Sequence, residues 1–318
     1  MSIVYFIARY FMYFFIPLLV VAISGMFSER SGVIHMALDS VMVFSAMFGI
    51  LFLNAFTGKI APQLLLILSL LVAGVTGVIF TMALAYAAIN LRAEQNIVGQ
   101  ALNTFAPAFC IFFARAMNDG SEHLYFENDF KISSVPILGD IPVIGPMFFQ
   151  ECYLTTFIGI GIFIISAIVM NKTRFGLRLS ACGENPQAAD SLGINVQKQR
   201  YMALIVSGFL GGMGGLMYIL PISAAYSCTV AGYGFLAMSV LIFGQWRPKT
   251  IFFAAVFFAL CKTLASSYTA IPFLAALPVP DAFYKSLPFI ITLVALAFTS
   301  KHDHSPKASG QPYDVGKR

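Results

Sequence analysis

The sequence predicts an all-α polytopic membrane protein of about eight to ten transmembrane helices, with broken or re-entrant segments. Of its 318 residues, 59% are apolar and only 10% are charged, whereas a soluble domain carries roughly 25% charged residues. Long uncharged stretches are the second observation, because about 20 apolar residues cross the hydrocarbon core of a bilayer. The formal charge of +5 is too scattered to form a nucleic-acid-binding face.

The uncharged stretches give the predicted crossings in chain order. They cover residues 10–28, 40–58, 60–91, 95–114, 152–171, 201–246, 263–280 and 286–300. Arg247, Lys249 and the tail after Lys301 are also predicted to be cytoplasmic, which requires four crossings after Arg200, so the seventh crossing is placed at about 250–270 with Lys262 inside it. As one helix, the 201–246 stretch would be about 69 Å long, more than twice the membrane, so it must fold back. Pro221, Gly232 and Gly234 are the predicted break points, because proline removes a backbone donor and glycine relaxes the helix.

The charges of two loops predict the orientation of the chain. Loop 118–151 carries six acids and one base, whereas loop 172–200 carries five bases and two acids. Since Lys and Arg are enriched in cytoplasmic loops, 118–151 is predicted to be extracytoplasmic and 172–200 cytoplasmic. Residues 1–300 then form one transmembrane domain, and the polar segment 301–318 is predicted to be a flexible cytoplasmic tail.

The side on which the chain begins depends on the segment 29–58. We favour a cytoplasmic N-terminus, which requires this segment to enter the membrane and return as a broken hairpin. If the segment instead crosses once, the N-terminus is extracytoplasmic.

A short helix with recognisable ends lies at the centre of the cytoplasmic loop. Asn185 is the predicted N-cap, Pro186 occupies the first helical position and Gly193 is the predicted C-cap. This helix is either a capped surface connector or a docking helix that fits a groove in a cytoplasmic partner.

Two further segments place polar groups next to predicted crossings, where they are costly unless they face protein or a wet cavity. Segment 29–40 is either a polar turn at the membrane surface or a broken helix that lines a pathway. Segment 91–103 puts amides on one helix face, where they either bind a polar solute or hydrogen-bond neighbouring helices. The candidate pathway residues are Ser31, His35, Asp39, Asn96, Gln100 and Asn103.

The sequence contains no G-x-x-x-x-G-K-[ST] loop that would cradle a phosphate, so an ATPase is not expected in this chain. The run of glycines between 208 and 215 lies among apolar residues and is interpreted as a surface for close helix packing. The residues therefore give little support for an enzyme, and no cofactor is predicted in this chain.

These motifs resemble the permeases of ABC importers of the ribose and branched-chain amino acid class. Segments 29–33 and 91–103 resemble the subgroup that imports nucleosides, although this chain carries His35, Ala37, Asp39 and Ser40 where relatives often have Asn, Gly, Glu and Gly. The residues that resemble the family's coupling helix are Gly183, Glu184, Asn185, Pro186, Gln187, Ala188, Ala189 and Gly193.

The resemblance implies a permease subunit of the cell membrane that translocates nucleosides, with purine nucleosides favoured and riboflavin or a simple sugar such as ribose as alternatives. It implies three partners: an ABC ATPase subunit that binds ATP and Mg²⁺, a second permease subunit expected to be a different chain, and an extracytoplasmic substrate-binding protein. An ion-coupled secondary transporter is the rival class, with His35, Asp39 and Lys262 as loose candidates for an ionisable relay.

Overall fold

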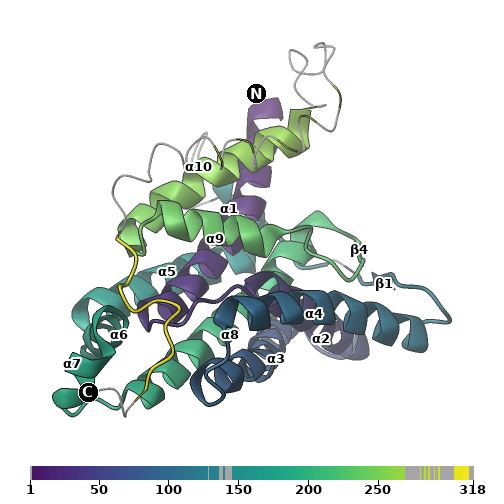
Figure 1. Ribbon diagram of the computed structural model, residues 1–318. Coiled ribbons are helices and arrows are strands. Elements are labelled where there is room, and N and C mark those ends of the chain that lie inside the picture. Colours follow the sequence, from purple (N-terminus) through teal and green to yellow (C-terminus); the bar gives the residue numbers. More distant parts are fainter. Residues whose placement is uncertain are drawn as a thin grey trace.

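The computed structural model describes residues 2–127, 129–135, 139, 145–268 and 304–314, with positions 280, 283, 286, 290 and 293 (Figure 1). Its helices are α1 (Ser2–Arg30), α2 (Leu38–Phe56), α3 (Pro62–Ile89), α4 (Gln95–Met117), α5 (Leu154–Lys172), α6 (Arg174–Glu184), α7 (Pro186–Ser191), α8 (Val196–Ile222), α9 (Tyr233–Phe243), α10 (Pro248–Ser267) and the π-helix η1 (Gly145–Phe149). Its short strands are β1 (Leu124–Tyr125), β2 (Lys131–Ser134), β3 (Gln150–Tyr153) and β4 (Ala225–Tyr226).

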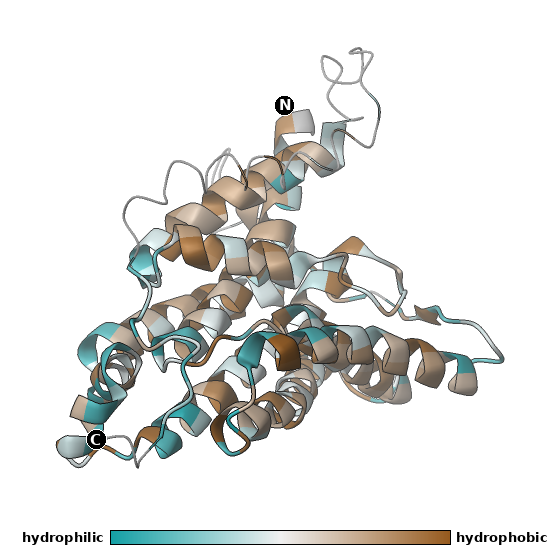
Figure 2. Ribbon diagram, in the orientation of Figure 1, coloured by the Kyte–Doolittle hydropathy of each residue, from teal (hydrophilic) through white to brown (hydrophobic). Residues whose placement is uncertain are grey.

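Seven of the described helices are long and apolar enough to cross a membrane: α1, α2, α3, α4, α5, α8 and α10. Figure 2 shows mainly apolar colours along these helices, with hydrophilic residues gathered on α6, α7 and the nearby C-terminal segment. The prediction of an all-α polytopic membrane protein is confirmed. The crossing expected near 250–270 is α10, and the one expected at 286–300 lies outside the described residues apart from three single positions.

The ends of the long helices meet at two opposite faces, which we call the loop face, after loop 118–151, and the α7 face. At the loop face, the Arg9 guanidinium of α1 donates to the Pro146 carbonyl oxygen (3.3 Å), and the Asn54 amide of α2 donates to the Tyr125 carbonyl oxygen (2.8 Å). At the α7 face, α1 ends against α6, where Gly183 packs on the backbone of Arg30.

The favoured cytoplasmic N-terminus required a broken hairpin, and residues 29–58, all of which the structure describes, do not form one. α1 begins beside loop 118–151 and ends beside α6, and α2 then returns to the loop face as one continuous helix, so 29–58 crosses once. The start of α1 therefore lies on the opposite side of the bundle from α7. Charge bias could not reveal this, because the single early base, Arg9, forms an ion pair with Glu151 of the acidic loop.

The long stretch 201–246 folds back where the sequence predicted. α8 ends one residue after Pro221, and α9 begins after Gly232, whose φ of 73° lies in the left-handed region that favours glycine. Between the two helices, β4 pairs with β1 in antiparallel register, Leu124 opposite Tyr226, so the reversal lies on the loop face. The second two-stranded sheet pairs β2 with β3 within the acidic loop.

The core of the bundle is built around α8, which packs against α1, α2 and α3. A Cβ atom on Gly212 would collide with the Ala73 carbonyl oxygen of α3, and one on Gly215 with the Met42 carbonyl oxygen of α2. These helices approach so closely that no side chain fits between them. The interpretation of the glycine run as a packing surface is confirmed.

Candidate functional site

The predicted short helix is present as α7, on the face to which it gives its name. The Asn185 side-chain oxygen accepts from the Ala188 N–H (3.0 Å), as an N-cap does, and Pro186 is the first helical residue. The helix ends at Ser191 and its C-cap is Leu192, so the prediction of Gly193 as C-cap is wrong by one residue; Gly193 follows in the left-handed region with a φ of 80°. The six helical residues thus form a rigid projection with both ends fixed.

One side of α7 is anchored and the other is open. Ala189 is buried in a small apolar cluster with Cys182, Val196 and Tyr313. Burial raises the pKa of the Cys182 thiol, although the nearby Arg200 opposes the shift, so the thiol stays neutral in this cluster. Leu192, by contrast, is 81% exposed, an apolar side chain presented on a polar surface. Such a surface is able to hold a partner without losing its attachment to the bundle.

Behind α7, the connection between α1 and α2, residues 31–37, is irregular and buried. The Gln95 side-chain oxygen accepts from the Ile34 N–H (2.7 Å). Asn103 donates from Nδ2 to the Met36 carbonyl oxygen (2.8 Å) and accepts the Ser40 N–H at Oδ1 (3.1 Å). Asn103 lies about 12 Å along α4 from Gln95, so the connection rises from the α7 face into the bundle. Irregular backbone at that depth is tolerated because protein groups satisfy it.

The structure separates the six predicted pathway residues into two groups. Ser31 and His35 are fully buried, and neither ring nitrogen of His35 has a hydrogen-bond partner among the described residues. The Asp39 carboxylate accepts from the Gly234 N–H at the first turn of α9 (2.8 Å). Ser31 and His35 thus lie within the α1–α2 connection, and Asp39 and Asn103 lie beside it.

Asn96 and Gln100 form the second group, and they are exposed on the outer side of α4. Asn103 has turned toward α2 and holds the connection in place, so it serves as a hydrogen-bonding group between helices. The amide that shares this task, Gln95, was not among the predicted site residues. The sequence did hold a signal for this role of Gln95, because Gln95 is the first amide of the amide-rich segment 91–103.

A contact between α1 and the α9–α10 turn was also missed from the sequence. The Trp246 indole N–H donates to the buried Glu29 carboxylate (2.5 Å), and the Arg30 Nε donates to the Trp246 carbonyl oxygen (3.0 Å). Gln245 and Trp246 both adopt positive φ values, 48° and 54°, which non-glycine residues rarely do. The sequence signal for this contact was Trp246 itself, because it is the only Trp in the chain and ends a long apolar stretch.

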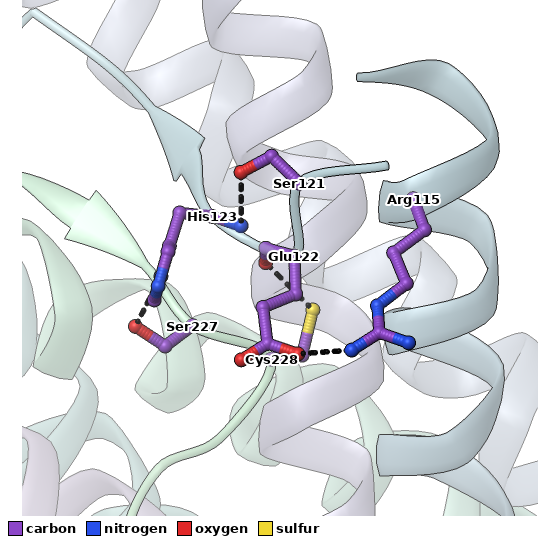
Figure 3. A network of polar contacts seen from close by, with 6 residues as sticks. All are labelled: Arg115, Ser121, Glu122, His123, Ser227 and Cys228. Atoms are coloured by element: carbon purple, nitrogen blue, oxygen red, sulfur yellow. Dashed lines mark hydrogen bonds and ion pairs between the residues drawn. The ribbon is translucent and has the colours of Figure 1, made fainter. Parts of the chain in front are cut away.

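On the loop face, a polar network ties α4 and β1 to the segment after α8 (Figure 3). Arg115 forms an ion pair with Glu122 (3.0 Å), and His123 Nδ1 lies 3.1 Å from the Ser227 hydroxyl. The Cys228 thiol donates to the Glu122 carbonyl oxygen (3.6 Å). Burial, and next the Glu122 charge, raise the pKa of Cys228 to about 11, so the thiol keeps the proton it donates.

Comparison with known proteins defines the chain as a membrane transport permease, the class that its multi-pass helical fold also indicates. It belongs to the family described as the permease component of branched-chain amino acid transport systems, which matches residues 7–296. No solved structure gives a significant match to the chain.

Several curated relatives are named as ABC transporter permeases. The chain is 37% identical over 303 residues to the guanosine ABC transporter permease protein NupQ of Bacillus subtilis (strain 168), covering 95% of this chain and 94% of the relative. It is 36% identical over 302 residues to the nucleoside ABC transporter permease protein NupC of Lactococcus lactis subsp. cremoris (strain MG1363), with the same coverage. The permease NupB of that strain matches over 108 residues, 33% of this chain and 30% of the relative, at 32% identity.

The chain is therefore a multi-pass permease subunit of an ABC transport system. Such a subunit is not an enzyme; ATP hydrolysis belongs to a separate subunit of the same system. The predicted family, fold class and absence of a catalytic role are confirmed by these similarities.

Proposed function

We propose that this chain is the permease subunit of an ATP-driven importer that brings nucleosides into the cell, with purine nucleosides as its solutes. The observation that carries the proposal is the similarity, over 95% of the chain, to permeases named for guanosine and for nucleosides. A partial match to a second permease, NupB, supports pairing with a different permease chain. An extracytoplasmic binding protein delivers the solute.

The α7 face is cytoplasmic and the loop face extracytoplasmic in this proposal. The bases of loop 172–200 support that orientation, because Lys and Arg accumulate in cytoplasmic loops. Residues 304–314 lie at the α7 face, since the Ala308 N–H donates to the Gly183 carbonyl oxygen (2.9 Å), and are thus cytoplasmic too. The start of α1 is extracytoplasmic.

α7 is the coupling helix on which the ATPase subunit docks. Its exposed side offers Gln187, Ala188 and Leu192, while Ala189 anchors it. When ATP closes the ATPase dimer, the movement reaches α7 first and then α6 and α8, which flank it in the chain. Arg200 of α8 donates to the Ser31 carbonyl oxygen (3.3 Å), so α8 carries the movement to the α1–α2 connection.

The solute passes between this chain and the second permease subunit, along the side of α4 that exposes Asn96 and Gln100. Exposed amides in the first two turns of a crossing are costly where they meet lipid, which favours a polar pathway or a partner at this position. Ser31, His35, Asp39 and Asn103 form the movable wall behind that side. The buried ring of His35, which has no hydrogen-bond partner in the part of the chain that the structure describes, supports a second conformation in which it gains one.

The decisive experiment is uptake of radiolabelled guanosine by vesicles that hold both permease subunits, the ATPase and the binding protein. We expect uptake that requires ATP and is blocked by unlabelled adenosine but not by ribose or riboflavin. Competition by ribose or riboflavin alone would contradict a nucleoside solute. Uptake driven by an ion gradient without ATP would support a secondary transporter instead.

The coupling role of α7 is tested in the same vesicles with Ala188→Glu. A charged side chain on the exposed side of α7 should abolish solute-stimulated ATP hydrolysis while the complex still inserts in the membrane. Gly193→Pro should act in the same way, because proline cannot adopt the φ of 80° found there. Full stimulation in both variants would refute the assignment of α7.

A further inference from the structure

The C-terminal residues 304–314, which we call the strap, lie across the α7 face instead of extending away from it (Figure 1, yellow). The Ala308 N–H donates to the carbonyl oxygen of Gly183 (2.9 Å), at the end of α6. The Gly310 N–H donates to the carbonyl oxygen of Gly32 (3.1 Å), in the α1–α2 connection. The strap therefore joins the segment that carries α7 to the connection behind it.

Side chains fix both ends of this arrangement. Tyr313 is only 9% exposed and completes the apolar cluster under α7 with Cys182 and Ala189. Arg200, 1% exposed, donates from Nε to the Ser31 carbonyl oxygen and from Nη1 to the Gln311 carbonyl oxygen, both at 3.3 Å. A buried guanidinium is expensive without acceptors, and the strap supplies one of the two that Arg200 uses.

The strap fits closely against the bundle because glycines, which have no side chain, stand at two points of contact. A Cβ on Gly32 would lie 3.0 Å from Arg200 Nη2 and 3.3 Å from the Ala308 carbonyl oxygen. A Cβ on Gly310 would lie 2.9 Å from the Ile34 side chain, at a φ of 77° that disfavours any other residue. The contact is too close and too specific for a passive extension.

The outer side of the strap lines a cleft of about 280 Å³ together with the start of α7. Glu184, Asn185 and Gln187 form one wall of this cleft, and Lys307, Gln311 and Pro312 form the other. Because the lining is mostly polar and lies beside the exposed side of α7, a protein surface suits it better than lipid does. The cleft has room for one or two side chains of such a partner.

We propose that the strap and α7 form one composite docking surface for the ATPase subunit. This rests on the proposed function, because the occupant is the ATPase subunit that an ATP-driven importer must contain. This chain has no phosphate-binding loop and so cannot supply the ATPase activity itself. The strap supplies half of the surface, and its hydrogen bond to Gly32 and its contact with Arg200 pass movement of the ATPase to the α1–α2 connection.

The test measures ATPase binding to the permease pair in lipid nanodiscs. A chain that ends at Asp303 lacks the strap, whereas a chain that ends at Asp314 keeps it and is the matched control. We expect the control to bind like the full chain and the strapless chain to bind about tenfold or more weakly, as loss of central interface residues does. Equal affinity for both chains would overturn the proposal.

A second variant avoids any loss of fold. Pro312→Trp fills the cleft from an exposed position, so it should weaken ATPase binding about tenfold while leaving the permease pair intact. The rate at which a maleimide labels Cys182 reports whether the strap is in place. The thiol is buried in the full chain, and it should stay buried in Pro312→Trp. In the strapless chain, labelling should be about tenfold faster. Cys182→Ser identifies the labelled site.

Two results count against the proposal here: ATPase binding unchanged by Pro312→Trp, or equally fast labelling of Cys182 with and without the strap. Neither depends on the solute. A complex that binds the ATPase through the strap but transports no nucleoside would contradict the proposed function alone.

Discussion

α8 and α4 are both apolar enough to cross a membrane, yet they have opposite surroundings. In the most apolar part of α8, 83% of the residues are buried, against 22% in α4. α8 achieves this with glycines that admit neighbouring backbones, whereas α4 carries amides and phenylalanines on an open side. The contrast shows that hydropathy identifies a membrane crossing but not its surroundings. Small residues indicate a helix packed within its own bundle, whereas exposed amides indicate a helix that faces a partner.

The largest effect is expected from a side chain placed in the core of α8. Gly212→Leu would drive a side chain into the Ala73 backbone of α3, and a backbone cannot move aside. We expect no monodisperse permease after detergent extraction. Gly161→Leu in α5 is the matched control, because nothing lies within 4 Å of a Cβ there, and it should give wild-type yield. Equal yields would show that α8 does not hold the bundle together.

A smaller loss of stability is expected at the inward side of α4. Asn103→Ala leaves the Met36 carbonyl and the Ser40 N–H without their partner, which should cost about 2 kcal/mol of unfolding free energy. Asn103→Asp keeps the acceptor for the Ser40 N–H but loses the donor to the Met36 carbonyl. Its unfolding free energy should therefore lie between those of the wild type and Asn103→Ala. Thermal denaturation in detergent measures both, and a destabilisation no larger than that of Asn96→Ala would refute the positioning role.

This division within α4 marks the limit of sequence reasoning. Asn96, Gln100 and Asn103 follow helical spacing and fall within one broad face, so the sequence grouped them. Which edge of that face meets α2 depends on packing between segments far apart in the chain. The start of α7, by contrast, is encoded locally by Asn185 and Pro186, and the sequence predicted it correctly, whereas the C-cap is Leu192, one residue before the predicted Gly193.

The strap was unpredictable for a different reason. Its polar composition, rich in Pro and Gly, is typical of an unstructured tail. Two of the bonds that hold it run from backbone N–H groups of the strap to the carbonyls of Gly183 and Gly32, and no side-chain pattern encodes such bonds. Only Tyr313, an aromatic residue in a polar segment, signalled an anchoring point.

The outward side of α4 should affect transport without affecting stability. Asn96→Ala together with Gln100→Ala removes two exposed amides and no hydrogen bond that holds the bundle, so the melting temperature should stay unchanged. Guanosine uptake should fall about tenfold, as expected when one or two hydrogen bonds to a solute are lost. Thr104→Ala, further along the same exposed side, is a control for surface change. Unaltered uptake in the double variant would place the pathway elsewhere.

The smallest effect is expected where α4 reaches the loop face. The Arg115 and Glu122 side chains are 58% and 42% exposed, so water screens their attraction, and a double-mutant cycle with alanine should give a coupling of about 0.5 kcal/mol that declines with added salt. Nearby, Cys228 donates to the Glu122 backbone, which alanine at 122 leaves in place. A coupling above about 2 kcal/mol would mean that the pair is desolvated, and hence that a partner covers this end of α4 in the assembled importer.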